Sequence, residues 1–93
     1  MENQLKPLIL RTLPTASRFL YAECTKCLQC RVSETSLSIY QHDDGFRYNL
    51  SYADRENLKA WMIYGGFCFS LDELEADLKS IRERLNHRGL VTA

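Results

Sequence analysis

The chain has 93 residues, of which 45% are apolar and 26% are charged, and its 12 Lys and Arg residues balance its 12 Asp and Glu residues. This length and composition predict a single globular domain over residues 1–93. A net charge of zero disfavours a general nucleic-acid binder, which usually carries a basic excess, and no run approaches the ~20 apolar residues of a membrane span.

The N-terminal residues do not resemble a secretory signal, because residues 1–4 carry no basic stretch ahead of a long apolar core. We therefore expect a cytoplasmic protein whose cysteines are reduced thiols or metal ligands. Pro7 and Pro14 bracket a short apolar run over residues 8–13. This pattern predicts an extended segment, such as an edge strand.

Residues 15–31 fit either a helix or a pair of strands. As a helix, they would place five residues on one stripe: Phe19, Leu20, Cys24, Cys27 and Leu28. As strands, residues 19–21 and 28–32 would alternate, and residues 24–27 would form the turn between them. The helix makes the cysteines core residues, whereas the strands make them a possible metal-binding turn.

A β-hairpin is predicted over about 37–50, because Asp44-Gly45 is a strong signal for a two-residue turn. In that register Ile39 lies opposite Leu50, and Gln41 lies opposite Tyr48. One face of the hairpin is apolar and the other is polar, as expected for a sheet that is covered on one side only.

Two helices are predicted in the C-terminal part, over about 53–64 and 71–88. The first carries Leu58, Trp61 and Met62 on one face and ends at Gly65-Gly66, which we interpret as a helix cap. The sequence therefore predicts an α+β fold, in which the two C-terminal helices cover a small antiparallel sheet.

The second of these helices has the clearest pattern in the chain. Ser70 and Glu73 form a capping box, and leucine or isoleucine recurs every three or four residues between Leu71 and Leu85. Acidic residues cluster early in the helix and basic residues late, which suits the helix dipole.

Four cysteines are the main candidates for chemistry: Cys24, Cys27, Cys30 and Cys68. A C-x2-C pair from the N-terminal run would give two zinc ligands in one tight turn, and the other cysteines, His42 or His87 would complete the site. The chain has no second C-x2-C pair, and an iron–sulfur run would need a further Cys and Pro. We therefore expect no cofactor and favour Cys24, Cys27 and Cys68 as buried core thiols, with structural zinc as the alternative.

Support for catalysis is weak. His42 stands beside Asp43 and Asp44, but turns select these residue types for their backbone properties. The sequence contains no nucleophile elbow, no His-Glu-x-x-His and no Gly-rich loop that opens a helix. We expect no enzymatic activity.

Aromatic and arginine side chains predict a binding surface, because Tyr, Trp and Arg dominate protein–protein hot spots. The candidate partner-binding residues are Tyr40, Arg47, Tyr52, Arg55 and Tyr64. We expect a small cytoplasmic protein–protein interaction module, monomeric or homodimeric, that regulates or inhibits a larger protein assembly, a class that includes proteins of phages and mobile elements. Its partner would be another protein or a protein complex.

Two alternatives remain open at this point. One is a zinc-stabilised module that contacts nucleic acid through Lys26, Arg31, Arg47 and Arg55. The other is a thiol redox protein that uses a C-x-x-C pair, although the chain lacks the βαβ opening of a thioredoxin-like fold.

Overall fold

Five antiparallel strands follow an N-terminal helix and precede a C-terminal helix in the computed structural model. The model describes the backbone of residues 2–54 and 59–87 and the side chains of residues 3–52 and 64–86. The elements are α1 (Glu2–Thr12), β1 (Ser17–Ala22), β2 (Cys27–Val32), β3 (Thr35–His42), β4 (Gly45–Asp54), β5 (Lys59–Cys68) and α2 (Leu71–His87). None of the described helices is long and apolar enough to cross a membrane.

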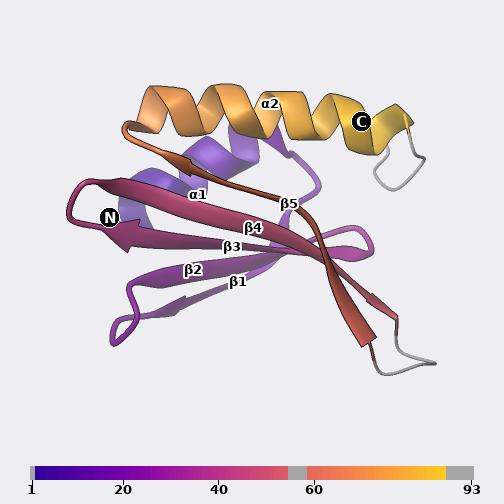
Figure 1. Ribbon diagram of the computed structural model, residues 1–93, viewed down its shortest axis with the longest axis horizontal. Coiled ribbons are helices and arrows are strands. Elements are labelled where there is room, and N and C mark those ends of the chain that lie inside the picture. Colours follow the sequence, from indigo (N-terminus) through magenta and orange to yellow (C-terminus); the bar gives the residue numbers. More distant parts are fainter. Residues whose placement is uncertain (1, 55–58, 88–93) are drawn as a thin grey trace.

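The sheet is a meander, in which each strand pairs antiparallel with the next one in the chain. Both helices lie on the same face of this sheet, with α1 beside α2 (Figure 1). Arg11 of α1 links the helices by donating a hydrogen bond of 2.7 Å to Glu75 of α2, and this guanidinium holds the pKa of the Glu75 carboxyl below its ordinary value. One face of the sheet is therefore covered, and neither of the described helices lies on the other face (Figure 1).

The core fills the space between the sheet and the two helices. Its aliphatic members include Leu5, Leu8 and Ile9 from α1, Leu13 directly after α1, Leu28, Val32, Leu37, Ile39 and Leu50 from the strands, and Leu74, Leu78, Ile81 and Leu85 from α2. All of these side chains are at most 3% exposed. Since full burial of one such side chain is worth about 1.5–3 kcal/mol, this layer accounts for much of the stability of the fold.

The predicted α+β class, the hairpin over about 37–50 and the helix over about 71–88 are confirmed. The capping box before α2 also forms, because the Glu73 amide donates to Ser70 Oγ at 3.2 Å. The Glu73 carboxylate accepts a hydrogen bond of 2.8 Å from the Phe69 amide. These bonds satisfy amide groups that a helix N-terminus otherwise leaves unpaired.

The predicted helix over about 53–64 is wrong. Residues 53–54 belong to β4 and residues 59–64 to β5, while residues 55–58 lie outside the described part. Gly65-Gly66 lies within β5 and is not a helix cap. A Cβ on Gly66 would lie 3.0–3.2 Å from the side chain of Tyr48, so this glycine leaves room for an aromatic ring on the neighbouring strand.

The helix that completes the layer is α1, where the sequence predicted an extended segment over residues 8–13. Pro7 lies inside α1, although proline removes one helical hydrogen bond. The apolar residues Leu5, Leu8, Ile9 and Leu13 nevertheless have helical spacing and are buried together. Burial of this stripe against the sheet outweighs the local cost of the proline.

The hairpin forms with a turn one residue earlier than predicted, at Asp43-Asp44. His42 pairs with Gly45, so Ile39 lies opposite Tyr48 and not opposite Leu50. The assignment of side chains to the two faces is unchanged, because each partner moves by two residues along the opposite strand.

Gly45 is required by the neighbouring strand β5. A Cβ at this position would lie 2.3 Å from the Cys68 carbonyl oxygen and 2.8 Å from the Phe67 ring. A glycine is therefore needed at position 45 because β4 lies close to β5 there. The turn itself is formed by Asp43 and Asp44.

We predict that Gly45→Ala lowers the free energy of unfolding by about 2 kcal/mol or more, since the methyl group would overlap backbone that cannot move without breaking strand pairing. Chemical denaturation measures this change. The control is Ser36→Ala on the solvent-exposed side of β3, where a change within about 0.5 kcal/mol is expected. Equal stabilities of the two variants would contradict the close approach.

Candidate functional site

The four cysteines lie in three different environments. Residues 15–31 form strand, turn and strand, so the strand interpretation of this segment is correct. Cys24 is exposed in the turn after β1, whereas Cys27 and Cys30 are both 3% exposed in β2. Their separation by three residues places them on opposite faces of the sheet, with Cys30 in the helix-covered core. Cys68 is buried at the end of β5.

This placement does not bring the predicted zinc ligands together. Among the described side chains, no group of three or more His, Cys, Asp or Glu residues is arranged to hold a metal ion. The zinc site remains a prediction. The preferred interpretation, in which Cys24, Cys27 and Cys68 are buried thiols, agrees with the burial of Cys27 and Cys68. It is wrong for Cys24, which is exposed, and Cys30 is buried as well.

Burial controls the chemistry of these thiols. Removal from water raises the pKa of Cys30 to about 12, and it raises the pKa of Cys27 despite a hydrogen bond from Tyr40. The thiolate is the nucleophile in disulfide exchange, and a raised pKa keeps these groups protonated at neutral pH. This environment counts against Cys27 as part of a redox pair with Cys24.

Asp77 of α2 connects the helix to two strands. Its Oδ2 atom accepts a hydrogen bond of 2.9 Å from the Tyr48 hydroxyl and one of 3.3 Å from the Cys68 thiol. Burial, reinforced by the Asp77 carboxylate, raises the pKa values of Tyr48 and Cys68 to about 12. Both donors therefore stay protonated, and the cluster fixes α2 on the sheet.

The face of the sheet without helices, here called the open face, carries polar, aromatic and basic side chains. Strand alternation and pairing place these described residues on it: Leu20, Cys27, Gln29, Arg31, Ser36, Ser38, Tyr40, His42, Arg47, Asn49 and Phe67. None of these residues is acidic. The open face therefore has a basic character, although the whole chain has no net charge.

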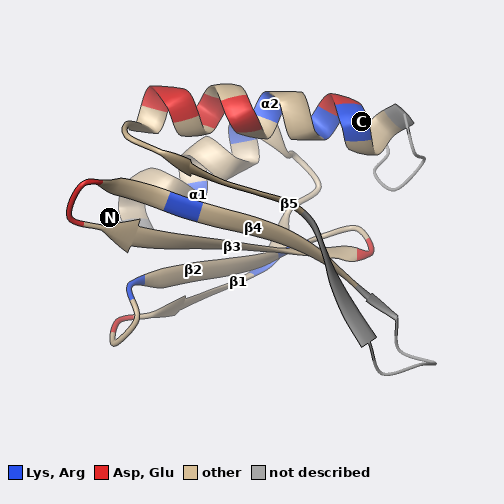
Figure 2. Ribbon diagram, in the orientation of Figure 1, with Lys and Arg blue, Asp and Glu red and all other residues tan. Residues whose placement is uncertain are grey.

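The charges of the molecule are distributed unequally between its two layers. Figure 2 shows acidic segments along α2 and in the turns, whereas the strands are nearly free of acidic residues. The acidic residues of α2 are Asp72, Glu73, Glu75, Asp77 and Glu83. The helix also carries Lys79, Arg82 and Arg84, so its five acidic residues are only partly balanced within α2.

Two of the predicted partner-binding residues are neighbours on the open face. Tyr40 pairs directly with Arg47, and Arg47 pairs with Phe67 of β5. Tyr52 and Tyr64 lie on the helix-covered side instead: Tyr52 pairs with the buried Thr35, and the Tyr64 ring lies 5.5 Å from the Arg84 guanidinium of α2. Arg55 lies outside the described residues.

An aromatic corner borders this face. Phe67 is 38% exposed and Phe69 is 70% exposed, and their rings meet edge to face with centroids 5.1 Å apart. The His42 ring lies 6.0 Å from that of Phe67. Strand alternation buries Cys68 between two outward phenylalanines, a pattern that the sequence alone did not separate from a fully buried triplet.

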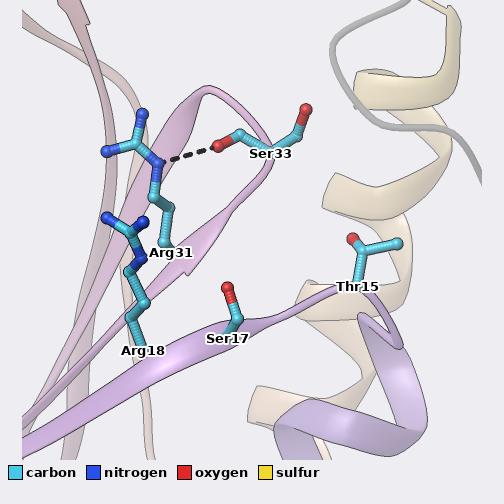
Figure 3. A pocket seen from close by; sticks show the side chains of 5 residues that line it. All are labelled: Thr15, Ser17, Arg18, Arg31 and Ser33. Carbon is cyan, nitrogen blue, oxygen red and sulfur yellow. Dashed lines mark hydrogen bonds between the residues drawn. The ribbon is translucent and has the colours of Figure 1, made fainter.

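A pocket of about 330 Å³ lies where β1 begins and β2 ends, and the sequence analysis did not identify it. It is lined by Thr15, Ser17, Arg18, Arg31 and Ser33 (Figure 3). Arg31 donates a hydrogen bond of 3.1 Å from Nε to the Ser33 carbonyl oxygen. The lining thus combines two guanidinium groups with three hydroxyl groups and includes no carboxylate.

Comparisons with known proteins give no match: no family model matches the chain, and searches of curated proteins and of solved structures find none.

We predict that the protein loses stability as the pH rises from about 9 to 12. Cys30, Cys68 and Tyr48 have pKa values of about 12 in the fold, against ordinary values of 9.0, 9.0 and 10.0. Across this window the unfolded chain has released protons that the folded chain still holds, so each group lowers the free energy of unfolding by up to about 1.4 kcal/mol per pH unit. Below about pH 8 the stabilisation is complete.

Urea denaturation at several pH values measures this slope. Cys30→Ala is less stable at pH 7, because it leaves a cavity, but its free energy of unfolding falls less steeply with pH. An unchanged slope in Cys30→Ala would contradict a strongly raised pKa for this thiol.

We also predict that Asp77→Ala lowers the free energy of unfolding by about 2 kcal/mol, because it leaves the Tyr48 hydroxyl and the Cys68 thiol without their acceptor. The matched control is Glu83→Ala, which removes an exposed carboxylate from the same helix and is expected to change stability by less than about 0.5 kcal/mol. Thermal and chemical denaturation of both variants at pH 7 provide the measurement. Similar losses in the two variants would contradict a linking role for Asp77.

Proposed function

We propose that the protein is a small non-enzymatic interaction module that binds an acidic surface of a partner protein with its open face and thereby regulates or inhibits a larger assembly. The observation that carries this proposal is the chemistry of the open face, on which aromatic and basic side chains adjoin and no described position is acidic. Opposite charge on the partner would give the contact its specificity and a faster association rate.

The centre of this surface has the composition of a binding hot spot. Tyr40, Arg47 and Phe67 occupy one row across β3, β4 and β5. Directly opposite residues have Cβ atoms about 4.5–5.5 Å apart, so the three side chains form a continuous strip. Tyr and Arg are the residue types that contribute most to protein–protein affinity.

The neighbouring row supplies groups suited to the polar rim of an interface. It contains Gln29, Ser38 and Asn49 on three adjacent strands. Ser38 is only 8% exposed, but the side-chain amides of Gln29 and Asn49 can donate hydrogen bonds to a partner backbone or accept them from it. An apolar and cationic centre with a polar surround is the usual anatomy of a protein interface.

A non-enzymatic role is supported by how the potentially reactive groups are used. His42 packs against Phe67, and Cys30 and Cys68 are held protonated by burial. The Asp77 carboxylate accepts two hydrogen bonds that join α2 to the sheet. These groups have structural partners that explain their presence without catalysis.

A nucleic acid is the competing occupant of the same face, since an open sheet with aromatic side chains can stack unpaired bases. The described positions of the open face include only two arginines, Arg31 and Arg47, and the net charge is zero. Nucleic-acid binding depends on neutralising several phosphates with basic side chains. The charge pattern therefore favours an acidic protein surface.

We test the proposal by affinity enrichment from lysate with and without nuclease treatment, followed by calorimetry with the purified partner. Three baits are compared: the natural protein, Arg47→Glu on the open face, and Arg82→Glu on α2 as the charge-matched control. Arg47→Glu is expected to weaken the partner's affinity at least about tenfold, which corresponds to ~1.4 kcal/mol. Arg82→Glu is expected to retain the natural affinity within about twofold, because it leaves the open face unchanged.

Three results would overturn the proposal. The first is that every protein captured by the natural bait is also captured by Arg47→Glu. The second is that Arg47→Glu and Arg82→Glu weaken the partner's affinity equally. The third is capture that disappears on nuclease treatment, which would instead support the nucleic-acid alternative.

A further inference from the structure

We infer that the pocket lined by Thr15, Ser17, Arg18, Arg31 and Ser33 is a binding site for a phosphate monoester or free phosphate. This inference stands on the pocket itself (Figure 3) and does not depend on what the open face binds. The shared chemistry of these ligands is a tetrahedral dianion that accepts several hydrogen bonds.

The charge of the pocket points to an anion. Arg18 and Arg31 bring two positive charges to one small cavity, and among the described residues neither forms a salt bridge. Like charges at short range repel each other, and an anion between them would convert this repulsion into attraction. Acidic residues occur elsewhere in the chain, yet none lines this pocket.

The two arginines supply hydrogen-bond donors at this pocket. The Nε atom of Arg31 is held by the Ser33 carbonyl oxygen at 3.1 Å, which fixes the guanidinium plane and leaves its two terminal nitrogens as donors. The Arg18 guanidinium has no hydrogen bond to another described residue, so all its N–H groups are available. Guanidinium groups bind phosphate oxygens in a bidentate manner.

The hydroxyl groups favour a tetrahedral anion over a carboxylate. Thr15, Ser17 and Ser33 line the same pocket, and each hydroxyl can donate one hydrogen bond. A planar carboxylate has two oxygens, and one arginine satisfies both, whereas a phosphate presents three or four oxygens to donors on several sides. The volume of about 330 Å³ has room for a phosphoryl group and part of the molecule that carries it.

An irregular backbone assembles this lining. Ser17 and Arg18 are consecutive, so in a regular strand their side chains would point to opposite faces of the sheet. The pairing of β1 with β2 shifts between Ser17 and Leu20, and Arg18 has a φ of 56°. The shift brings both residues into one pocket, as β-bulges do where they redirect a side chain.

The second irregular residue of the pocket is Ser33, with a φ of 55°. Glycine is the residue that adopts this left-handed conformation without steric cost. Three described non-glycine residues have such a φ, and two of them, Arg18 and Ser33, line the pocket. Ser33 lies in the two-residue turn between β2 and β3, where hairpins favour a positive φ. The turn thus brings Ser33 to the pocket.

The test compares Arg18→Gly with Lys26→Gly. Lys26 also has a left-handed φ, 49°, but it lies in the turn after β1 and does not line the pocket. Both substitutions remove one positive charge and replace a left-handed residue with glycine. Both variants should therefore keep their melting temperature or gain up to about 5 °C. Only Arg18→Gly removes a hydrogen-bond donor that lines the pocket.

Binding is measured by ¹H–¹⁵N NMR titration with inorganic phosphate, against sodium chloride at equal ionic strength. We expect phosphate to shift the signals of Arg18, Arg31 and Ser33 in a saturable manner, and Arg18→Gly to weaken binding at least tenfold while Lys26→Gly leaves it within twofold. Arg31→Gln is a second pocket variant with the same expected loss, and it decides the question if Arg18→Gly does not fold.

A parallel titration uses a short phosphoserine peptide and its unphosphorylated form. Tighter binding of the phosphopeptide than of inorganic phosphate assigns the site to a phosphorylated protein, and equal or weaker binding assigns it to free phosphate. The inference is overturned if phosphate shifts no more signals than chloride does, or if Arg18→Gly and Lys26→Gly weaken binding equally.

Discussion

Burial of a single face of the sheet is the constraint on which the rest of this structure depends. Both helices pack on one side, so along each regular strand every second side chain enters the core and the others remain on the open face. A slip of one residue in any pairing would exchange these two sets. Core, binding surface and cysteine environments are therefore fixed by the same alternation.

The sequence predicted those features that depend on local pattern, namely the α2 helix, the hairpin and the two faces of that hairpin. The sequence-based prediction was wrong where the secondary structure depends on contacts with residues that are distant in the sequence. The spacing of Leu58, Trp61 and Met62 suits a helix, but residues 59–64 pair with β4. Pro7 suggested an extended segment, yet burial against the sheet makes residues 2–12 helical. For the candidate sites, Tyr40 and Arg47 were identified from residue type alone, whereas the role of Arg18 depends on an irregular pairing that no sequence pattern announced.

Both candidate sites depend on an uneven distribution of charge between the helix layer and the sheet. Five acidic residues lie on α2, together with three basic ones (Figure 2). The described positions of the open face include Arg31 and Arg47 but no acidic residue. A chain of zero net charge thereby presents a basic surface without a general attraction for polyanions. Ser17 pairs with Arg31, and Arg31 with Ser36 of the open face, so the phosphate pocket adjoins the proposed partner surface.

The meander order of the strands has a consequence for how the chain folds. Since each strand pairs with its immediate neighbour in sequence, nearly all sheet contacts close short loops, and the entropy lost in forming each hairpin is small. Such local topologies fold faster than sheets whose strands pair across long intervals. The contact between α1 and α2 joins the two ends of the chain. Arg11 and Glu75 are 64 residues apart in the sequence, so closing this contact costs more chain entropy than closing any of the hairpins.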